Sequence, residues 1–372
     1  MNEDFVVTPW EVKGRVDYEK LAKEFGTSKI DEKLLKRIEK IAGELHFMLR
    51  RGIFFSHRDL DWILEKYGKG EKFFLYTGRG PSGHTHIGHL IPWIFTKWLQ
   101  EKFDVELYFQ LTDDEKFLVK RELSLEDTTN YAYENILDII AVGFDPEKTH
   151  IFTNTEYAKT QYKLALKIAK HVTFSTAKAV FGFNESSNIG ITFFPAMQAV
   201  PCFLPSVLKK KNIPCLIPAA IDQDPYWRIA RDVAPRLGFY KPAQIHSKFI
   251  PGLGPSGKMS ASEPKTTIFT TDSPDIAEKK IMGAFSGGQA TAELQRKLGG
   301  NPEICSICQY YYFLFEEDDE KVRKIFDDER SGKILSGEHK KELAQRVKKF
   351  IIEHQKKREK AKDRIEEFVL RD

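Results

Sequence analysis

The sequence predicts an α/β protein in which a doubly wound parallel sheet contains a helical insertion and is followed by an all-α C-terminal region. The apolar runs "KFFLYT" (Lys72–Thr77) and "VELYFQLT" (Val105–Thr112) have strand character, and the helical pattern "THIGHLIPWIFTKWLQEKF" lies between them. Together they form a βαβ unit, whose strands are parallel and whose crossover is right-handed. Strand character that returns after a long helical stretch predicts a second half of the sheet.

The N-terminal region, residues 1 to about 65, is polar and has helical periodicity. In "DEKLLKRIEKIAGELHFMLRR" the apolar residues recur at helical spacing, with Asp31 near the start and Arg50 and Arg51 at the end. This charge distribution suits the helix dipole. We therefore expect a mostly helical N-terminal extension.

The pattern from Asp113 to Ser206 is mostly helical, and Ser124 with Asp127 forms a carboxylate variant of the capping box. Strand character resumes at "IPCLIPAAI", and a helix over Tyr226–Arg236 and a strand near "AQIHSKFI" follow. After about Asp272 the chain is helical and highly charged. The expected units are an N-terminal extension (1–65), a sheet domain (66–271) with its helical insertion at about 115–206, and a helical C-terminal domain (272–372).

Composition narrows the class of protein. With 372 residues, two or three structural units are expected. The charged fraction of 30% is nearly balanced at a net charge of +4, which neither demands nor excludes a polyanionic partner. No signal peptide or membrane-spanning run is recognisable, so we expect a soluble cytoplasmic protein with no membrane partner. The four cysteines are too few and too scattered for a disulfide framework; they are Cys202, Cys215, Cys305 and Cys308.

A glycine- and histidine-rich stretch, "GRGPSGHTHIGHL" (Gly78–Leu90), joins the first predicted strand to its helix. This is the phosphate-binding position of a Rossmann-like sheet, where the helix amides favour anions. His86 and His89 are three residues apart, on one side of the first turn, and can donate hydrogen bonds to phosphate oxygens. Gly88 leaves a flat backbone surface for a planar base. The alternatives are a connector with surface histidines and half of a metal site, which lacks a third ligand nearby.

A second loop, "GLGPSGKMSASEP" (Gly252–Pro264), follows the last predicted strand. Its glycines allow the loop to close over a nucleotide, Lys258 can neutralise phosphate charge, and the hydroxyls of Ser260 and Ser262 supply donors. Alone this stretch is an ordinary polar turn. Together with the histidine-rich stretch, it predicts a nucleotide site that two loops share.

Several side chains follow strands at the same predicted edge of the sheet. Asp222 follows "CLIPAAI" and can accept a hydrogen bond from a ribose hydroxyl, whereas Asp224 can cap the next helix. Tyr76 ends the first strand and Gln110 lies near the end of the second, so both belong to the edge where ligands bind in this architecture. Tyr76 is equally explained as a core tyrosine at a strand end.

The two loops resemble the signature motifs of class I aminoacyl-tRNA synthetases, "HIGH" at His86–His89 and "KMSAS" at Lys258–Ser262. The stretches "YTGRGPSG", "QLTDDEK", "FPAMQA" and "AIDQDPYWR" resemble the archaeal and eukaryotic branch of the tryptophanyl-tRNA synthetases, and the resemblance extends along essentially the whole chain. The commoner loop sequence of the class is KMSKS, so Ala261 replaces a lysine. Lys116 and Arg79 are the candidates for the missing cation.

This resemblance implies activation of L-tryptophan with ATP, followed by transfer to tRNA(Trp). ATP is then a substrate, Mg²⁺ is bound by its phosphates, no protein metal site is needed, and a homodimer is expected. The implied catalytic residues are His86, His89, Lys258, Ser260, Ser262 and Lys116. The implied ATP contacts are Arg79, Gly80, Gly88, Asp222 and Met259. The implied tryptophan contacts are Tyr76 and Gln110 at the indole N–H, and Glu115, Gln198 and Gln223 at the α-amino and carboxylate groups.

The C-terminal region contains eleven Lys and Arg but five Asp and Glu between Glu338 and Arg364. A basic helical face is usually only solvated, but the resemblance implies that this domain binds the anticodon. "CSIC" (Cys305–Cys308) is half of a zinc-site pattern, and without a second pair we expect structural thiols. The N-terminal "DFVVTPWEV" resembles an extension that covers the active site; the alternative is a peripheral hairpin. Candidate phosphate contacts are Lys340, Lys341, Arg346, Lys348 and Lys349.

Three other functions remain open at this point. The tyrosyl-tRNA synthetases share the layout and similar motifs. A metabolic nucleotidyltransferase also begins a helix with H-x-G-H, but it needs neither the Lys258–Ser262 loop nor a basic helical domain. A catalytically inactive RNA-binding relative is disfavoured because His86, His89, Lys258 and Ser260 are all present.

Overall fold

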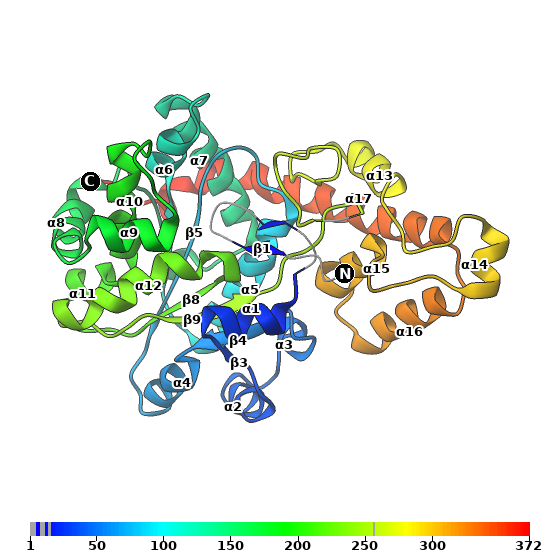
Figure 1. Ribbon diagram of the computed structural model, residues 1–372, viewed down its shortest axis with the longest axis horizontal. Helices are drawn as coiled ribbons and strands as arrows, with labels where there is room; N and C mark the ends of the chain where they lie inside the picture. Colours follow the sequence, from blue (N-terminus) through cyan, green and yellow to red (C-terminus); the bar gives the residue numbers. More distant parts are fainter. Residues whose placement is uncertain (1–4, 8–11, 14–15, 256) are drawn as a thin grey trace.

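A seven-stranded sheet forms the centre of the protein in the computed structural model, which describes residues 5–7, 12–13, 16–255 and 257–372 (Figure 1). The strand order is β3-β4-β9-β8-β5-β6-β7; β4 pairs antiparallel with its neighbours, and the five strands from β9 to β7 are parallel. The strands are β3 (Ser28–Lys29), β4 (Phe54–Arg58), β5 (Phe74–Arg79), β6 (Leu107–Leu111), β7 (Thr149–Thr153), β8 (Cys215–Ala220) and β9 (Ala243–Ser247).

The parallel part of the sheet has the doubly wound order. The first of these strands in the chain, β5, lies at its centre; β6 and β7 follow on one side, and β8 and β9 on the other. The order therefore reverses between β5 and β8, and ligands bind beyond the carboxyl ends of the strands at such a switch point. This topology confirms the predicted fold class.

Two hydrophobic cores cover the two faces of the sheet. Alternate residues of β5 point to opposite faces, so Leu75 belongs to one core, whereas Phe74 and Tyr76 belong to the other. The first core includes apolar residues of α5 (Ile87–Phe103). The second packs against the insertion helices α8 (Ala158–Ala169), α9 (Phe174–Phe181) and α10 (Ile189–Ala199), and against α12 (Asp224–Val233). Tyr76 thus faces the insertion.

Three details differ from the sequence-based expectation. The helix predicted over residues 31–51 ends early, because Gly43 at φ +83° terminates α2 (Glu32–Ala42) and a short α3 (Phe47–Arg50) follows. The N-terminal region, predicted to be mostly helical, also supplies β3 and β4 to the main sheet. The helical stretch 113–206 contains the strand β7, which pairs with β6.

A small two-stranded antiparallel sheet lies in the N-terminal region. Its strands are β1 (Val6–Val7) and β2 (Val12–Lys13), and α1 (Tyr18–Phe25) follows. The Nζ of Lys20 lies 5.4 Å from the centroid of the Phe5 ring. Trp10, the other aromatic residue of "DFVVTPWEV", lies outside the described residues.

The C-terminal helices extend away from the sheet, and the last long helix returns to it (Figure 1). On α17, His354 bonds to Asp138 of α7 (Leu125–Val142) at 2.8 Å, and Arg358 makes a second ion pair with Asp138. Beyond α17, the carbonyl of Phe368 accepts the Ile151 N–H of β7 at 2.8 Å. These helices are α13 (Pro274–Met282), α14 (Ala292–Leu298), α15 (Ser306–Tyr310), α16 (Asp319–Arg330) and α17 (Ser336–Ala361). Among the described residues, no helix combines the length and the apolar character that crossing a bilayer requires.

A buried ion pair fixes β4 to the start of α12. Arg58 donates from Nε and Nη2 to the two carboxylate oxygens of Asp224, at 2.6 and 3.0 Å, and Arg228 donates to the same carboxylate at 2.6 Å. Burial alone would raise the pKa of Asp224, but Arg58 and its neighbours outweigh this effect and lower it. Asp224 is not the N-cap that the sequence predicted, because Gln223 occupies that position.

The Arg58→Met variant should lower the free energy of unfolding by about 2–3 kcal/mol, because it leaves a buried carboxylate with a single guanidinium partner. Chemical denaturation measures this loss. Lys69→Met is the exposed control and should lower the free energy of unfolding by less than about 0.5 kcal/mol. Since the pKa of Asp224 is lowered, its stabilisation is complete above its unfolded pKa near ~4 and is lost as the pH falls through the folded pKa. Equal destabilisation by the two variants would contradict this account.

Candidate active site

Backbone hydrogen bonds bring the two signature stretches together. The N–H of Ile87 donates to the carbonyl of Ile268 at 3.0 Å, and the N–H of Thr270 donates to the carbonyl of Thr85 at 2.9 Å. The segment around Ile268 directly follows the "KMSAS" loop, and Thr267 Oγ1 donates to the Ser260 carbonyl at 2.6 Å. The beginning of α5 and this loop therefore lie side by side at the carboxyl edge of β5.

The two histidines are stacked and neutral. Their ring centroids are 3.5 Å apart, and the His86 N–H donates to His89 Nδ1 at 3.1 Å. Burial, together with the positive charges of Arg79 and Lys258, holds the pKa of both imidazoles well below 6.5. Because Nδ1 of His89 accepts a hydrogen bond, the single proton of the neutral ring lies on Nε2. His89 therefore offers an N–H donor at neutral pH.

Lys258 contacts the carboxylate that the sequence assigned to the ribose. Its Nζ donates to Asp222 Oδ2 at 2.8 Å, and Asp222 lies just beyond β8 with an exposed fraction of 4%. Three buried polar atoms around this contact have no hydrogen-bond partner in the described part of the chain: Asp222 Oδ1, His86 Nδ1 and Arg79 Nε. Since buried polar groups are almost always hydrogen-bonded, such a cluster at a switch point indicates a polar ligand site.

The rest of the loop is held close to the beginning of α5. Buried Met259 donates its N–H to the Ile250 carbonyl at 3.0 Å, and the hydroxyls of Ser260 and Ser262 are 2.9 Å apart. A Cβ at Gly88 would lie 3.0 Å from His86 Nδ1 and 3.1 Å from Ile250 Cγ2. A side chain at position 88 would therefore press on His86 and Ile250.

Lys116 lies on the other side of the switch point, against the glycine-rich turn. Its Nζ donates to Glu115 Oε1 at 2.8 Å, and Thr112 donates to the other oxygen at 3.1 Å. A Cβ at Gly80 would lie 2.0 Å from Lys116 Cε, so a larger residue would displace this lysine side chain. Arg79 ends β5 beside this turn, and burial lowers its pKa to about 10, which keeps it cationic at neutral pH.

A chain of buried hydrogen bonds runs across the ends of β5 and β6. Tyr76 donates its hydroxyl proton to Gln110 Oε1 at 2.6 Å and accepts from Gln198 Nε2 at 2.8 Å. Burial raises the pKa of Tyr76 well above its usual value, so the phenol stays protonated. Gln198 belongs to the insertion helix α10, and half-buried Gln223 lies in the turn after β8. The predicted residues Tyr76, Gln110 and Gln198 are thus in direct contact.

The sequence analysis missed the continuation of this chain. Gln110 Nε2 donates to Asn154 Oδ1 at 2.8 Å, and Asn154 Nδ2 donates to Asp114 Oδ1 at 2.8 Å. Burial raises the pKa of Asp114 to about 7. Asn154 directly follows β7, so recognising "THIFT" as a strand would have placed it at the same edge.

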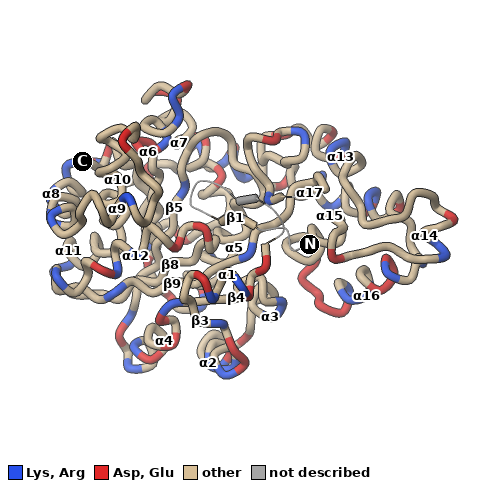
Figure 2. The backbone as a smooth tube through the Cα atoms, in the orientation of Figure 1, with Lys and Arg blue, Asp and Glu red and all other residues tan. Residues whose placement is uncertain are grey.

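The C-terminal lysines and arginines are not uniformly available. Acidic segments alternate with basic ones in this part of the chain (Figure 2). Arg346 is paired with Glu316 and Glu342, and Lys348 with Asp275 and Glu278. By contrast, no ion pair involves Lys340 or Lys341 within the ranges that the structure describes, and Lys349 lies 3.9 Å from Glu353. Arg346 and Lys348 are therefore structural cations of the folded chain.

Comparison with known proteins gives one consistent result. The family model described as tRNA synthetases class I (W and Y) matches residues 68–351. A tryptophan–tRNA ligase of Saccharolobus solfataricus is 56% identical, over 99% of this chain and 96% of that protein. The tryptophan–tRNA ligase of Pyrococcus furiosus is also 56% identical, over 99% of this chain and 94% of that protein.

Solved structures agree with these relatives. The tryptophanyl-tRNA synthetase of Plasmodium falciparum superposes with a TM-score of 0.88 at 44% identity, over 95% of this chain and 97% of that one. The structure of the Encephalitozoon cuniculi tryptophanyl-tRNA synthetase bound to tryptophan superposes with a TM-score of 0.87 at 40% identity. The match covers 96% of this chain and 99% of that one. The chain belongs to the class I tRNA synthetase family that serves tryptophan and tyrosine.

Proposed function

We propose that this protein is a tryptophan–tRNA ligase that activates L-tryptophan with ATP and transfers it to tRNA(Trp). Its family membership and the names of its relatives, which match along nearly the whole chain, support this substrate. The observation that carries the proposal is a set of buried atoms at the switch point, beside the Lys258 loop, that have no hydrogen-bond partner among the described residues: Asp222 Oδ1, His86 Nδ1 and Arg79 Nε. The proposed reaction belongs to protein synthesis, and the protein is proposed to act in the cytoplasm.

The activation step requires no protein nucleophile, because the tryptophan carboxylate itself attacks the α-phosphorus of ATP. The bond from that phosphorus to the bridging oxygen of pyrophosphate breaks, and tryptophanyl-adenylate forms. The protein must align the reactants and stabilise the charge on the departing pyrophosphate. The N–H of His89, the imidazole of His86 and the hydroxyls of Ser260 and Ser262 are the proposed donors. Mg²⁺ arrives with the ATP phosphates.

Two lysines donate hydrogen bonds to carboxylates that are proposed to bind the substrates. We infer that Lys258 leaves Asp222 for the phosphates, which frees both carboxylate oxygens for the ribose hydroxyls. Likewise, Lys116 leaves Glu115, which then accepts the tryptophan ammonium group. Lys116 and Arg79 together supply the positive charge that the second lysine of KMSKS provides elsewhere. Gly80, Gly88 and Met259 shape the ATP site through the packing described above.

The pocket for the indole ring lies between the sheet and the insertion, at Tyr76, Gln110 and Gln198. A pocket built to hydrogen-bond one substrate group rejects analogues that lack it, because its own polar atoms are then left unpaired. Phenylalanine has no ring N–H, and the hydroxyl of tyrosine is placed differently. Gln223, beside Asp222, is the proposed contact of the α-amino or carboxylate group. No separate editing domain is needed for this discrimination.

The proposed domain roles, the tRNA partner and the oligomeric state are inferred from the family. The proposed units are the sheet domain (66–271), to which the N-terminal extension (1–65) adds β3 and β4, and the anticodon-binding helices (272–372). The proposed insertion at about 115–206 includes the strand β7 of the same sheet. In the second step the 3′-terminal ribose of tRNA(Trp) attacks the activated carbonyl, and AMP leaves. We infer a homodimer from the family alone.

The first test is ATP–pyrophosphate exchange with tryptophan, tyrosine or phenylalanine as the only amino acid. We expect exchange with tryptophan. Exchange with tyrosine or phenylalanine should be at least ~10³-fold weaker, because either amino acid leaves a polar group of the pocket unpaired. Exchange that depends on tyrosine would reassign the protein within its family. Absence of exchange with every amino acid would contradict the proposed function.

The second test concerns the imidazole pair. His89→Ala should lower the rate of tryptophan-dependent exchange by about 10²–10³-fold, since it removes a donor to the departing pyrophosphate. His84→Ala, in the same loop but exposed, is the control and should stay near the wild-type rate. Filter binding should show unchanged affinity for tRNA(Trp) in both variants. Equal exchange by the two variants would remove His89 from the mechanism.

The third test separates free cations from structural ones in the C-terminal domain. Lys341→Glu should weaken tRNA(Trp) binding and reduce the slope of log affinity against log salt by about 0.7–1, as expected for the loss of one phosphate contact. Lys279→Glu, on α13, is the matched charge reversal at a site not proposed to contact RNA. The same change of slope in both variants would show that only net charge matters.

A further inference from the structure

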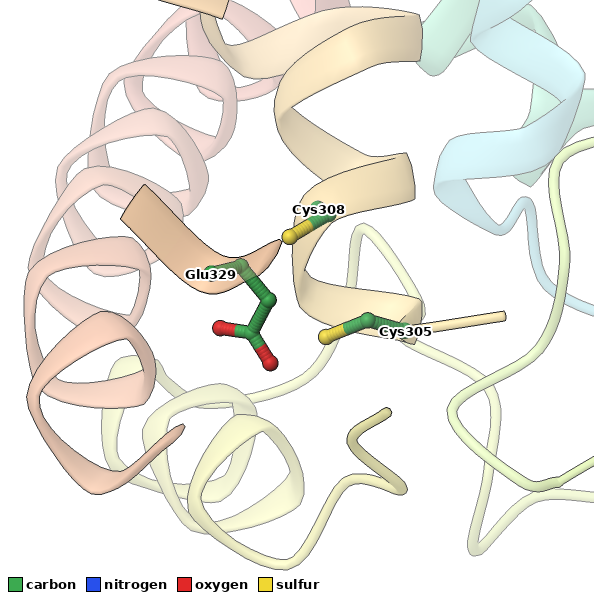
Figure 3. A group of neighbouring side chains, drawn as sticks. All are labelled: Cys305, Cys308 and Glu329. Carbon is green, nitrogen blue, oxygen red and sulfur yellow. The ribbon is translucent and has the colours of Figure 1, made fainter. Parts of the chain in front are cut away.

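Two cysteines and a glutamate meet in the C-terminal domain, away from the active site. Cys305 and Cys308 lie at the start of α15, and Glu329 lies near the end of α16. Their sulfur atoms and a carboxylate oxygen all lie within 4.8 Å of one another (Figure 3). All three residues are buried, with exposed fractions of 1%, 0% and 0%. Figure 3 shows the two sulfurs and the carboxylate turned toward one space between the helices.

The carboxylate of Glu329 is only partly satisfied. Its Oε2 lies 3.0 Å from Nδ1 of His339, which belongs to α17 and is itself buried. Its Oε1 is buried and has no hydrogen-bond partner among the described residues. A Cβ at Gly300 would lie 2.6 Å from this Oε1, so a glycine makes room for the carboxylate here. A buried carboxylate oxygen without a partner is costly unless a cation or a donor meets it.

Two sulfurs and a carboxylate therefore meet in the protein interior, and one carboxylate oxygen has no hydrogen-bond partner among the described residues. A divalent cation between the three groups would give each of them a partner.

We propose that Cys305, Cys308 and Glu329 bind a zinc-class divalent ion that ties α15 to α16, with His339 of α17 orienting the carboxylate. Two sulfur ligands and one oxygen ligand favour a borderline-soft ion such as Zn²⁺ over Mg²⁺ or Ca²⁺, which prefer oxygen alone. A ligating carboxylate that is hydrogen-bonded to a second side chain is the usual arrangement at such sites. This proposal differs from the expectation of purely structural thiols.

The site lies where three C-terminal helices meet, so its role is structural. Ser306, the residue after Cys305, donates to the carbonyl of Gly252 at 3.2 Å, at the base of the "KMSAS" loop. The ion would therefore stabilise the contact between the C-terminal helices and the loop that holds Lys258. This inference is independent of which amino acid the protein activates.

The test uses the full-length protein, reduced with a phosphine and freed of metal by a chelator, then titrated with Co²⁺. One Co²⁺ per chain should bind and give a near-ultraviolet thiolate-to-cobalt charge-transfer band, and Zn²⁺ should abolish the band by displacement. Zn²⁺ should also raise the midpoint of thermal unfolding, because it binds the folded state preferentially. A wild-type protein without the charge-transfer band at saturating Co²⁺ overturns the proposal, whatever the variants show.

Variants assign the ligands. Cys305→Ser/Cys308→Ser should lose the band, and Glu329→Gln should weaken binding because it removes the charged oxygen ligand. His339→Gln should weaken binding by about 10–100-fold while keeping the band, because the sulfur ligands remain. Cys202→Ala/Cys215→Ala removes the other two cysteines, which lie in the core beneath the insertion, and should bind as the wild type does. Circular dichroism checks that each variant is folded. Equal binding by the two double-cysteine variants overturns the site, as does a Cys305–Cys308 disulfide in protein purified without reductant.

Discussion

The pairing of residues 85–87 with residues 268–270 is the constraint on which the active site depends. Its backbone hydrogen bonds hold the first turn of α5 against the segment that follows the "KMSAS" loop. Without it, the imidazole pair and Lys258 would lie on separate loops with no common orientation. Because the switch point between β5 and β8 lies beside this pairing, Asp222 reaches the same space. Sheet topology and one long-range backbone pairing therefore build the site together.

Electrostatics keeps the site ready for an anion. Arg79 and Lys258 place positive charge beside two neutral imidazoles, and the low pKa of each imidazole avoids adding further repulsion. Lys116 and Lys258 are meanwhile each paired with a carboxylate that the substrates are proposed to use. Substrate binding would thus exchange ion pairs within the site rather than expose a buried charge. In the C-terminal domain, too, buried polar groups from separate helices meet, at Cys305, Cys308 and Glu329.

The sequence predicted the fold well where local signals are strong, and missed what depends on long-range pairing. The strand β5, the helix α5 and the capping box at Ser124 have clear periodicity and end signals, and all three are present. The strand β7 was missed because five residues between helices give too short a pattern, and Asn154 was missed with it. No local pattern could bring Glu329 to "CSIC", because their proximity arises only from helix packing. Likewise, the ion pairs of Arg346 and Lys348 depend on elements distant in sequence.

The most direct measurement is a crystal structure of the protein with tryptophan and a non-hydrolysable ATP analogue. The account predicts a triphosphate between the His86–His89 pair and the Lys258 loop, with the ribose on Asp222 and Lys258 turned from that carboxylate to a phosphate. An analogue bound elsewhere, or bound in this place while Lys258 remains on Asp222, would contradict it.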